Sequence, residues 1–541
     1  MKKKRALSMI LCTGLLAASL LTGCSSQTVS EETTENATTS TDVDTANNPE
    51  DSAGDSNEEK MKISIAIWDI GTAVNPDKQD AVLEKLENDF NIEIEPVAVT
   101  WNDFSEKFQI WSATNELPDI VAHSQSLKDV WKWKDQGVIR AIPDDLSAYP
   151  NLSKYLEDER SNVFVQDGKR WAIPRLQFSD DKYAYGKTIF VWKDIYDSLG
   201  LEKKPETYDE LKEMFLKIKE QYPDMVPLTS QNLGYMFFLV MNENPYMMDG
   251  YGKFESGKWE NGFFQESTVD ALEKMRELWS LGIIDKDWPI NKDTTNGGDK
   301  FAEKRAAAVV TTPYPTHIYY TFGTTWEKMH PDEDLGENLE MINMPSSSDG
   351  KWYFNSGTFY SESYFSANVD DAKMERILQL YDYLLSEDGI NLMRYGIEGV
   401  DFVKSGDEIE ITREKDESGN FVALTTKYPS VGSLRPLVFW DEDFPFVDPT
   451  IKESIRRFGE EYMEWKQSNT EEYPGHNPWI STISSPLKDN FQTDILNDCV
   501  KIVIAEGDVR SEWQKTVDEY MNLGYEEMIE EFNAVAAEAG Y

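Results

Sequence analysis

Cysteine and histidine are scarce in this 541-residue chain, which contains three of the first and four of the second. Cys12 lies within an apolar N-terminal run and Cys24 directly follows it, so Cys499 has no expected partner in a folded domain. We therefore expect no structural disulfide. The histidines are scattered, and no cysteine–histidine cluster has the spacing of a zinc site. A metal site would have to use oxygen ligands, and we expect neither a metal nor a cofactor.

Positive charge is also in short supply. Lys and Arg number 53 against 99 Asp and Glu, which gives a formal net charge of −46. So negative a chain is a poor partner for nucleic acid or for an anionic lipid surface. An anionic polysaccharide is disfavoured for the same reason, unless the binding site is locally basic. Aromatic residues, by contrast, make up 12% of the chain, and they belong either to the core or to a binding surface.

Only one long apolar run is present, from Ala6 to Leu21, and it follows a basic start. A transmembrane helix needs about 20 apolar residues, so the run is better explained as the core of a secretory signal peptide. The four residues that end at Cys24, Leu-Thr-Gly-Cys, resemble the bacterial lipobox. That resemblance implies cleavage after residue 23 and a lipid on Cys24. An ordinary cleaved signal with a chance cysteine is the alternative.

The segment after Cys24 cannot build a core. Residues 25–60 contain thirteen Ser or Thr and ten Asp or Glu, with almost no large apolar residue. Too little apolar surface is available there to offset the conformational entropy lost on folding. We therefore predict that residues 24–60 are a disordered acidic tether that holds a folded domain away from the membrane.

From residue 61 onward the pattern is that of an α/β protein. "KISIAIW" and "NIEIEPVAV" read as strands, and apolar residues at helical spacing lie between them. A strand–helix–strand unit of this kind implies a parallel pair. Thr207 and Glu210 form a capping box at the start of a helix over 207–222. Further helices are predicted over 268–281, 371–386, 449–467, 487–504 and 509–538. About 480 residues exceed one core, so at least two lobes are expected.

Several segments, in order along the chain, resemble the carbohydrate type of extracellular solute-binding lipoprotein that serves ABC importers, in its large-ligand branch from Gram-positive bacteria. They are "NELPDIVAHS", "GKRWAIPR", "VWKDIYDSLGLEKKPETYDELKEMFLKIKEQYP", "LWSLGIIDKDW", "FAEKRAAAVVTTPYP" and "LLSEDGINLMRYGIEG", with the helical C-terminus. The resemblance implies two α/β lobes around a ligand cleft, three interlobe crossings near 174, 313 and 353–355, and closure on the ligand. It places 61–174 and 313–355 in lobe one, and 175–312 and 356–541 in lobe two.

The same resemblance implies a function. The protein would capture a carbohydrate at the outer face of the membrane and deliver it to the permease subunits of an importer. It would not be an enzyme, and Gly-x-Ser-x-Gly and His-Glu-x-x-His are both absent from the sequence. A peptide or another non-sugar solute is the alternative ligand, and an exported glycosidase or lyase is the third possibility. The calcium loop of many relatives is not expected, because "QYPDMVPLTSQN" has one carboxylate in its place.

Sugars present hydroxyls and apolar faces, so their sites combine flat aromatic rings with polar groups. Such residues converge at the carboxyl ends of parallel strands. On that basis we predict ligand contacts, with a neutral sugar, from residues at strand ends, crossings and helix ends. These are Trp68, Trp101, Gln125, Arg175, Gln177, Tyr183, Tyr314, Glu398 and Trp440.

Overall fold

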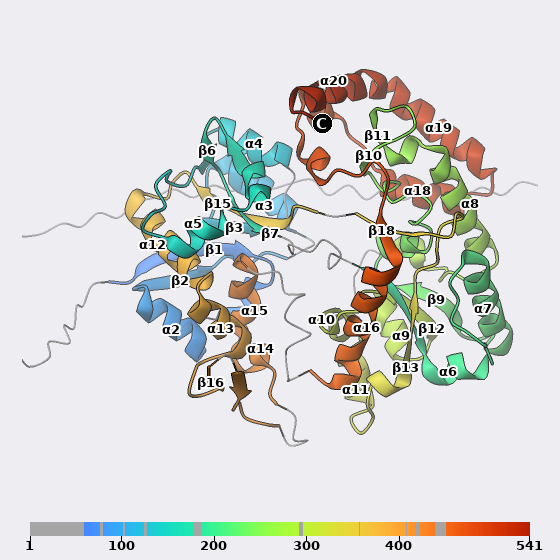
Figure 1. The fold of residues 1–541 in the computed structure, drawn as a ribbon, viewed down its shortest axis with the longest axis horizontal. Coiled ribbons are helices and arrows are strands. Elements are labelled where there is room, and N and C mark those ends of the chain that lie inside the picture. Colours follow the sequence, from blue (N-terminus) through green and yellow to red (C-terminus); the bar gives the residue numbers. More distant parts are fainter. Residues whose placement is uncertain are drawn as a thin grey trace, which may run out of the picture. The chain divides into compact units, whose positions relative to one another are not determined.

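The computed structural model describes residues 59–75, 79–100, 103–123, 127–176, 186–291, 296–355, 357–406, 408–416, 421–438 and 451–541. The predicted signal peptide, Cys24 and nearly all of the predicted tether lie outside these residues, so those features stay predictions. Two sheets dominate the described part, and each has helices around it (Figure 1). No helix among the described residues combines the length and the apolar character needed to cross a membrane.

The first sheet has the strand order β2-β1-β3-β15-β4, and β7 also pairs with β15. β1 runs parallel to both β2 and β3, which confirms the predicted strand–helix–strand unit. β15 is antiparallel to β3, β4 and β7. The strands are β1 (Met61–Ile67), β2 (Ile92–Pro96), β3 (Ile120–His123), β4 (Ile139–Arg140), β7 (Ile173–Leu176) and β15 (Phe359–Ser366).

Helices cover both faces of this sheet. Alternate side chains of its strands point to opposite faces and therefore pack in different cores. Ile63, Ile65 and Ile67 pack in one core, whereas Ala66 and Val121 pack in another. The first core takes side chains from α2 (Ala81–Asp89), α5 (Pro150–Tyr155), α12 (Asp371–Leu384), α13 (Glu387–Tyr395) and α15 (Pro429–Leu434). The second takes them from α3 (Phe104–Thr114) and α4 (Leu127–Asp135). This part also contains the short helices α1 (Ile70–Ala73) and α14 (Leu424–Lys427). Its two hairpins pair β5 (Val165–Gln166) with β6 (Lys169–Arg170), and β16 (Phe402–Ser405) with β17 (Glu408–Ile411).

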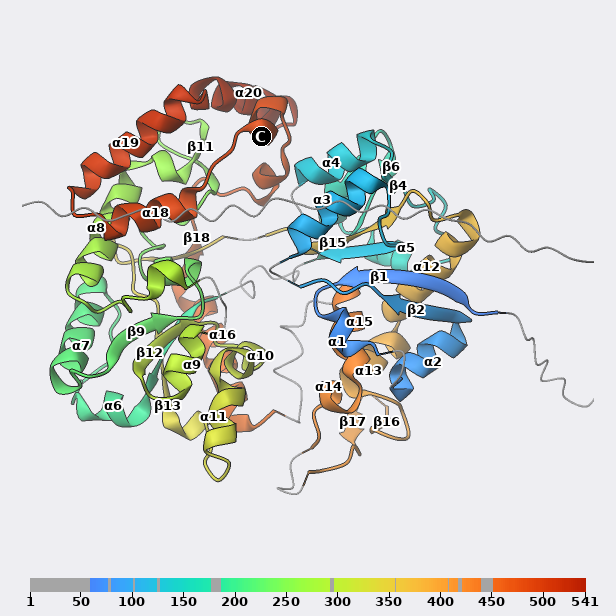
Figure 2. The same cartoon turned by 180° about the vertical axis from the view of Figure 1, so that it is seen from behind.

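The second sheet has the order β13-β8-β12-β9, with β12 parallel to β9 and antiparallel to β8. Every residue of β8 and β12 is buried, as expected for strands covered on both faces. Figure 2 shows α7 on one side of this sheet and α9 and α16 on the other. The strands are β8 (Thr188–Trp192), β9 (Val226–Ser230), β12 (Ala306–Thr311) and β13 (Leu339–Asn343).

The predicted helix with the capping box is α7 (Tyr208–Gln221), and both hydrogen bonds of the box are present. Two long predicted helices are wrong, because each is two helices in the structure. Residues 487–504 are divided between α17 (Pro486–Asn490) and α18 (Ile495–Ile504), and 509–538 between α19 (Val509–Asn522) and α20 (Tyr525–Glu538).

The other helices here are α6 (Lys193–Ser198), α8 (Glu266–Ser280), α9 (Asn296–Ala302), α10 (Pro315–Ile318), α11 (Thr324–Met329) and α16 (Glu453–Asn469). Two small sheets pair β10 (Tyr251–Lys253) with β11 (Trp259–Asn261), and β14 (Trp352–Phe354) with β18 (Thr470–Glu472).

The division of the chain between the two sheets differs from the expected lobes at three segments. Residues 313–355 were expected with the first lobe, but β13 pairs with β8, and Ile318, Phe322 and Trp326 pack in the core of the second sheet. Residues 371–438 were expected with the second lobe, but α12, α13 and α15 cover the first sheet. β15 was likewise expected with the second lobe, but it lies in the first sheet. The chain therefore leaves the first sheet after β7, returns at β15, and joins the second core again at α16.

Candidate functional site

An arginine lies between two aromatic rings at one edge of the first sheet. The Arg175 guanidinium carbon is 5.0 Å from the ring centroid of Trp68 and 4.8 Å from that of Tyr360. Arg175 is only 3% exposed, and cation–π contacts are strongest where water is excluded. Three strands bring the group together: Trp68 directly follows β1, Arg175 lies on β7, and Tyr360 lies on β15. We call these three side chains, with His123, the arginine cluster.

Ring contacts and hydrogen bonds hold the arginine cluster in place. The His123 ring, fully buried at the end of β3, stacks on Phe104 with centroids 3.7 Å apart and meets Trp68 edge-on at 5.1 Å. The Tyr155 hydroxyl donates to the Pro174 carbonyl at 3.0 Å and accepts from the Leu176 amide at 2.8 Å. Burial raises the pKa of Tyr155 to about 12, so this hydroxyl keeps its proton and pins the backbone on both sides of Arg175.

A pocket of about 180 Å³ lies beside the start of β8 and the end of β13, and it is lined mainly by aromatic and aliphatic side chains. Trp352 and Trp465 meet there edge to face, with centroids 5.7 Å apart. Two lysines also line the pocket, each 3% exposed. The Lys187 ammonium is 4.4 Å from the Tyr235 ring centroid and 5.1 Å from that of Phe238. The described lining residues are Gly186, Lys187, Phe238, Met241, Asn242, Pro245, Met344, Trp352, Tyr353, Phe354, Asn355, Tyr462, Trp465, Lys466 and Thr470; we call this space the lysine pocket.

One wall of the lysine pocket depends on a glycine. A Cβ added at Gly186 would lie 2.0 Å from the hydroxyl of Tyr462, so only glycine leaves room for this ring. The backbone of Lys187 hydrogen-bonds to the Tyr462 hydroxyl. This contact joins the start of β8 to α16, and it fixes the position from which the Lys187 side chain extends.

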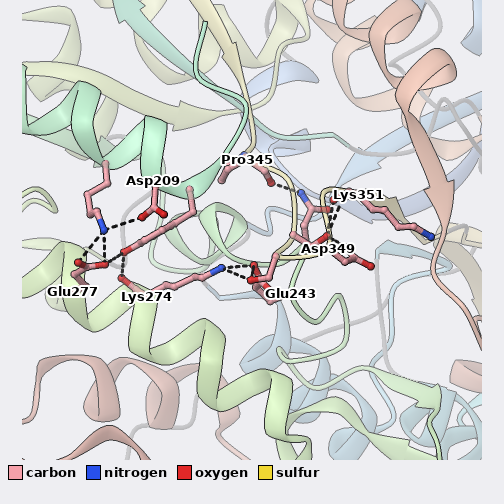
Figure 3. Close-up of polar contacts among 12 residues, drawn as sticks. Asp209, Glu243, Lys274, Glu277, Pro345, Asp349 and Lys351 are labelled. Atoms are coloured by element: carbon pink, nitrogen blue, oxygen red, sulfur yellow. Dashed lines mark hydrogen bonds and ion pairs between the residues drawn. The ribbon is translucent and has the colours of Figure 1, made fainter.

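A polar network holds the other wall. The Asn242 side chain donates to the Pro345 carbonyl at 2.7 Å and accepts from the Tyr353 amide at 2.9 Å, which ties β14 to the turn after η3 (Gly234–Leu239). Figure 3 shows Lys274 of α8 reaching Glu243, and Ser348 also donates to Glu243, at 3.1 Å. The segment between β13 and β14 is therefore anchored at several points beside the pocket.

Five of the nine predicted ligand residues, Trp101, Gln125, Gln177, Tyr183 and Trp440, lie outside the described residues, as does Cys24. Trp68 and Arg175 are brought together in the arginine cluster. Tyr314 is 1% exposed, and its hydroxyl contacts the sulfur of Met463 at 3.7 Å, so it packs within the structure rather than on a surface. Glu398 is exposed in the turn that leads to β16. The ligand roles of all nine residues stay predictions.

None of the nine predicted ligand residues is among the described lining of the lysine pocket. Lys187 lies well beyond the predicted crossing near 174, and Trp465 and Lys466 lie on a helix whose apolar spacing indicates core packing. Tyr360 was missed because the strand "FYSESYFS" carries aromatic and polar residues on both faces, without a clear apolar face. His123 could have been found, since it ends the buried strand before Gln125. Among the described residues, no group of three or more His, Cys, Asp or Glu could hold a metal ion.

Residues 72–390 match the model of the bacterial extracellular solute-binding protein family. The chain belongs to this family. This solute-binding protein is 25% identical over 479 residues to the polygalacturonan/rhamnogalacturonan-binding protein YtcQ of Bacillus subtilis. The alignment covers 85% of this chain and 89% of YtcQ. It is 26% identical over 262 residues to lipoprotein LipO of the same organism, covering 44% of this chain and 48% of LipO.

Solved structures give the fold of this solute-binding protein. The alginate-binding protein AlgQ2 without calcium ion superposes with a TM-score of 0.68 at 16% identity, over 88% of this chain and 98% of AlgQ2. FusA of Streptococcus pneumoniae in complex with kestose superposes with a TM-score of 0.62 at 15% identity, over 89% and 99%. The predicted α/β fold of the two-lobe solute-binding type is confirmed. The family consists of extracellular binding proteins, which agrees with the function class that the sequence predicted.

Proposed function

We propose that this protein captures a carbohydrate outside the cell and delivers it to the permease of an ABC importer, while a lipid on Cys24 holds it at the membrane. It binds its ligand without chemical change. The observation that carries the proposal is the arginine cluster, in which a buried guanidinium lies between the rings of Trp68 and Tyr360. Rings of this kind stack on the apolar faces of a sugar, and a guanidinium donates paired hydrogen bonds to its oxygens.

Three further observations support a sugar ligand. The lysine pocket beside the second sheet combines tryptophan, tyrosine and phenylalanine rings with two asparagine side chains, Asn242 and Asn355. YtcQ, which aligns over most of this chain, is named for binding polygalacturonan and rhamnogalacturonan. Two proteins that share the fold point the same way. AlgQ2 is named as an alginate-binding protein, and FusA was crystallised in complex with kestose. A ligand held by both sheets would favour a closed state, which an importer can recognise.

Titration calorimetry with a panel of plant and microbial oligosaccharides and peptides tests the proposal. At least one oligosaccharide should bind, remain chemically unchanged, and bind about 30- to 900-fold more weakly to Trp68→Ala, the cost of removing a buried aromatic anchor. Trp171→Ala is the matched control, because Trp171 is also half-buried beside a cation, Lys134 at 5.8 Å, but lies outside the arginine cluster. Binding of peptides alone, turnover of a bound sugar, or equal binding by Trp68→Ala and the parent would contradict the proposal.

A further inference from the structure

We infer that the lysine pocket binds a pyranose ring that carries an anionic group, such as the carboxylate of a hexuronate. This inference rests on the proposed carbohydrate function and specifies its ligand. It also replaces the expectation of a neutral sugar, which is based on the charge of the whole chain. The same expectation allows for an anionic sugar at a site that is locally basic. The described lining of this pocket is such a site.

Among its described residues, the lining carries positive charge, whereas the chain as a whole is negative. Lys187 and Lys466 both line the pocket, and none of its described lining residues is Asp or Glu. In a chain with 99 acidic and 53 basic residues, a wall with two lysines and no described carboxylate is a marked local reversal. Both lysines are 3% exposed, and taking an ammonium out of water is costly, so charges and dipoles nearby must stabilise it. An anionic ligand adds to that stabilisation.

Two of the acidic residues that are adjacent in sequence to the lining, Glu243 and Glu471, are engaged by other groups. Glu243, next to Asn242, is bound by Lys274 and Ser348 (Figure 3). Glu471, next to Thr470, is paired with Lys351. These pairs reduce the negative potential at the pocket, since each carboxylate has a positive charge beside it.

Asp349 lies in the same anchored segment. It accepts from the Ser347 hydroxyl and, at 3.0 Å, from the Tyr353 hydroxyl. The hydrogen bond from Ser347 contributes most to lowering the pKa of Asp349, so this carboxylate stays ionised and is satisfied within its own segment.

Size and shape favour one ring rather than a bare ion. The pocket measures about 180 Å³, below the range of roughly 300–1,000 Å³ typical of complete drug-sized ligands. Trp352 and Trp465 present apolar surfaces, and Asn242 and Asn355 supply polar groups for hydroxyls. The Lys466 ammonium is 5.8 Å from the Phe354 ring centroid, so a cation and a ring face lie together on one wall. A hexuronate has matching apolar, hydroxyl and anionic parts.

The test compares probes that differ only in charge. Calorimetry on the full chain would use trigalacturonic acid, the same trimer with its carboxylates methyl-esterified, and a neutral trisaccharide with and without a sulfate group. We expect the carboxylated or sulfated form to bind at least about tenfold more tightly than its neutral counterpart, because a hydrogen bond to a charged group is among the stronger polar contacts. Preference for the carboxylate over the sulfate identifies a uronate, and the reverse identifies a sulfated sugar.

Two variants locate the effect. Lys187→Met and Lys466→Met keep most of the apolar stem but remove the charge, and each should weaken binding of the charged probe about 10- to 100-fold while leaving the neutral probe unaffected. Lys253→Met is the control, because Lys253 also lies over a ring, Trp259 at 5.4 Å, but does not line the pocket. Unchanged melting temperatures would show that the variants fold.

The outcomes separate this inference from the proposed function. If a neutral oligosaccharide binds as tightly as its charged counterpart, the inference is wrong and the carbohydrate function stands. If charged probes bind but neither lysine variant weakens them, the anion is recognised elsewhere and the inference is again wrong. If no saccharide of any kind binds, both proposals fail.

Discussion

At the scale of single residues, burial forces some charged groups away from their ordinary ionisation. Lys488 of α17 is the clearest case. Its ammonium lies 5.0 Å from the Phe532 ring centroid and 5.5 Å from that of Tyr251, and it donates to the Ile483 carbonyl. Removal from water lowers its pKa to about 8, although Asp489 and Asp249 oppose the shift.

This shift predicts how stability depends on pH. Between pH 8 and about 10.5 the unfolded chain still holds the Lys488 proton while the native protein has lost it, so stability rises with pH across that window. Below pH 8 both states are protonated, and the native protein bears the whole cost of burying the charge. Lys488→Met should therefore raise the free energy of unfolding at pH 7, by about 1–3 kcal/mol, and lose that advantage by about pH 10.5. Urea unfolding of both proteins at intervals of pH would measure it; parallel profiles would contradict the prediction.

The sequence predicted some residues of the arginine cluster but not the lysines of the lysine pocket. Trp68 and Arg175 were predicted because the ends of strands and the passages between sheets can be recognised from apolar patterns. Lys187 and Lys466 were not, because a lysine on a strand or helix usually extends into solvent. Here the absence of a Cβ at Gly186 lets Tyr462 approach β8, and this packing buries Lys187. The burial of Lys187 is therefore decided by tertiary contacts, which a local sequence pattern does not show.

At the scale of elements, a buried carboxylate holds the β16–β17 hairpin to the first sheet's helices. Asp401 is fully buried and accepts from the Ile397 amide at 2.8 Å, the Lys427 ammonium at 2.9 Å and the Tyr428 hydroxyl at 2.9 Å. Its backbone carbonyl also accepts from the Arg413 amide. One residue thus connects the turn after α13 to α14 and to the start of α15.

We expect Asp401→Ala to destabilise the protein by about 3–5 kcal/mol, because it leaves buried donors and a cation without their partner. Hydrogen exchange should quicken across residues 397–413 before other parts of the first sheet. Glu387→Ala is a control on a neighbouring element, since Glu387 pairs with Lys404 at the surface and should leave the unfolding midpoint nearly unchanged. Equal effects of the two substitutions would show that Asp401 is not a structural hub.

Helix ends explain where the sequence prediction of elements failed. The predicted helix over 509–538 has continuous apolar spacing, but Gly524, at φ 98°, lies between α19 and α20 and turns the chain. A glycine within a helical pattern can also be tolerated, so pattern alone does not distinguish a break from a weak position. By contrast, α7 was predicted correctly because Thr207 and Glu210 mark its start by a specific pair of hydrogen bonds.

At the scale of the whole molecule, the predicted lipid on Cys24 decides where the protein works. Cys24→Ala removes the predicted attachment residue, which lies far in the chain from β1, the first strand. A diacylated anchor binds membranes stably, whereas one chain binds only marginally. The variant should therefore appear in the soluble fraction or as uncleaved precursor after cell fractionation. Its ligand affinity should equal that of the parent, and a variant that stays membrane-bound in processed form would contradict the lipid prediction.

The allocation of the chain to two sheets was only partly predictable. Local patterns identified β1, β2 and β3 and showed that one core was too small for the chain. They did not show that 313–355 packs with the second core or that α12 and α13 return to the first, because amphipathic helices and buried strands carry no mark of their partners. Ile318 and Trp326 are as apolar as residues of the first core, and their packing is decided only by the assembled sheet.

The position of β15 has a consequence for the order in which the chain can fold. β15 pairs with β3, β4 and β7 in the first sheet, yet the whole of the second sheet precedes it in the chain. During synthesis and export, amino end first, β3 and β7 would wait with open edges until this strand emerges, whereas no strand of the first sheet separates β8, β9, β12 and β13 in the chain. Pairings between distant segments form slowly, and open strand edges invite association with other chains. The first sheet, although its strands are made first, is thus the last to be completed, and a delay in the emergence of β15 would expose it to aggregation.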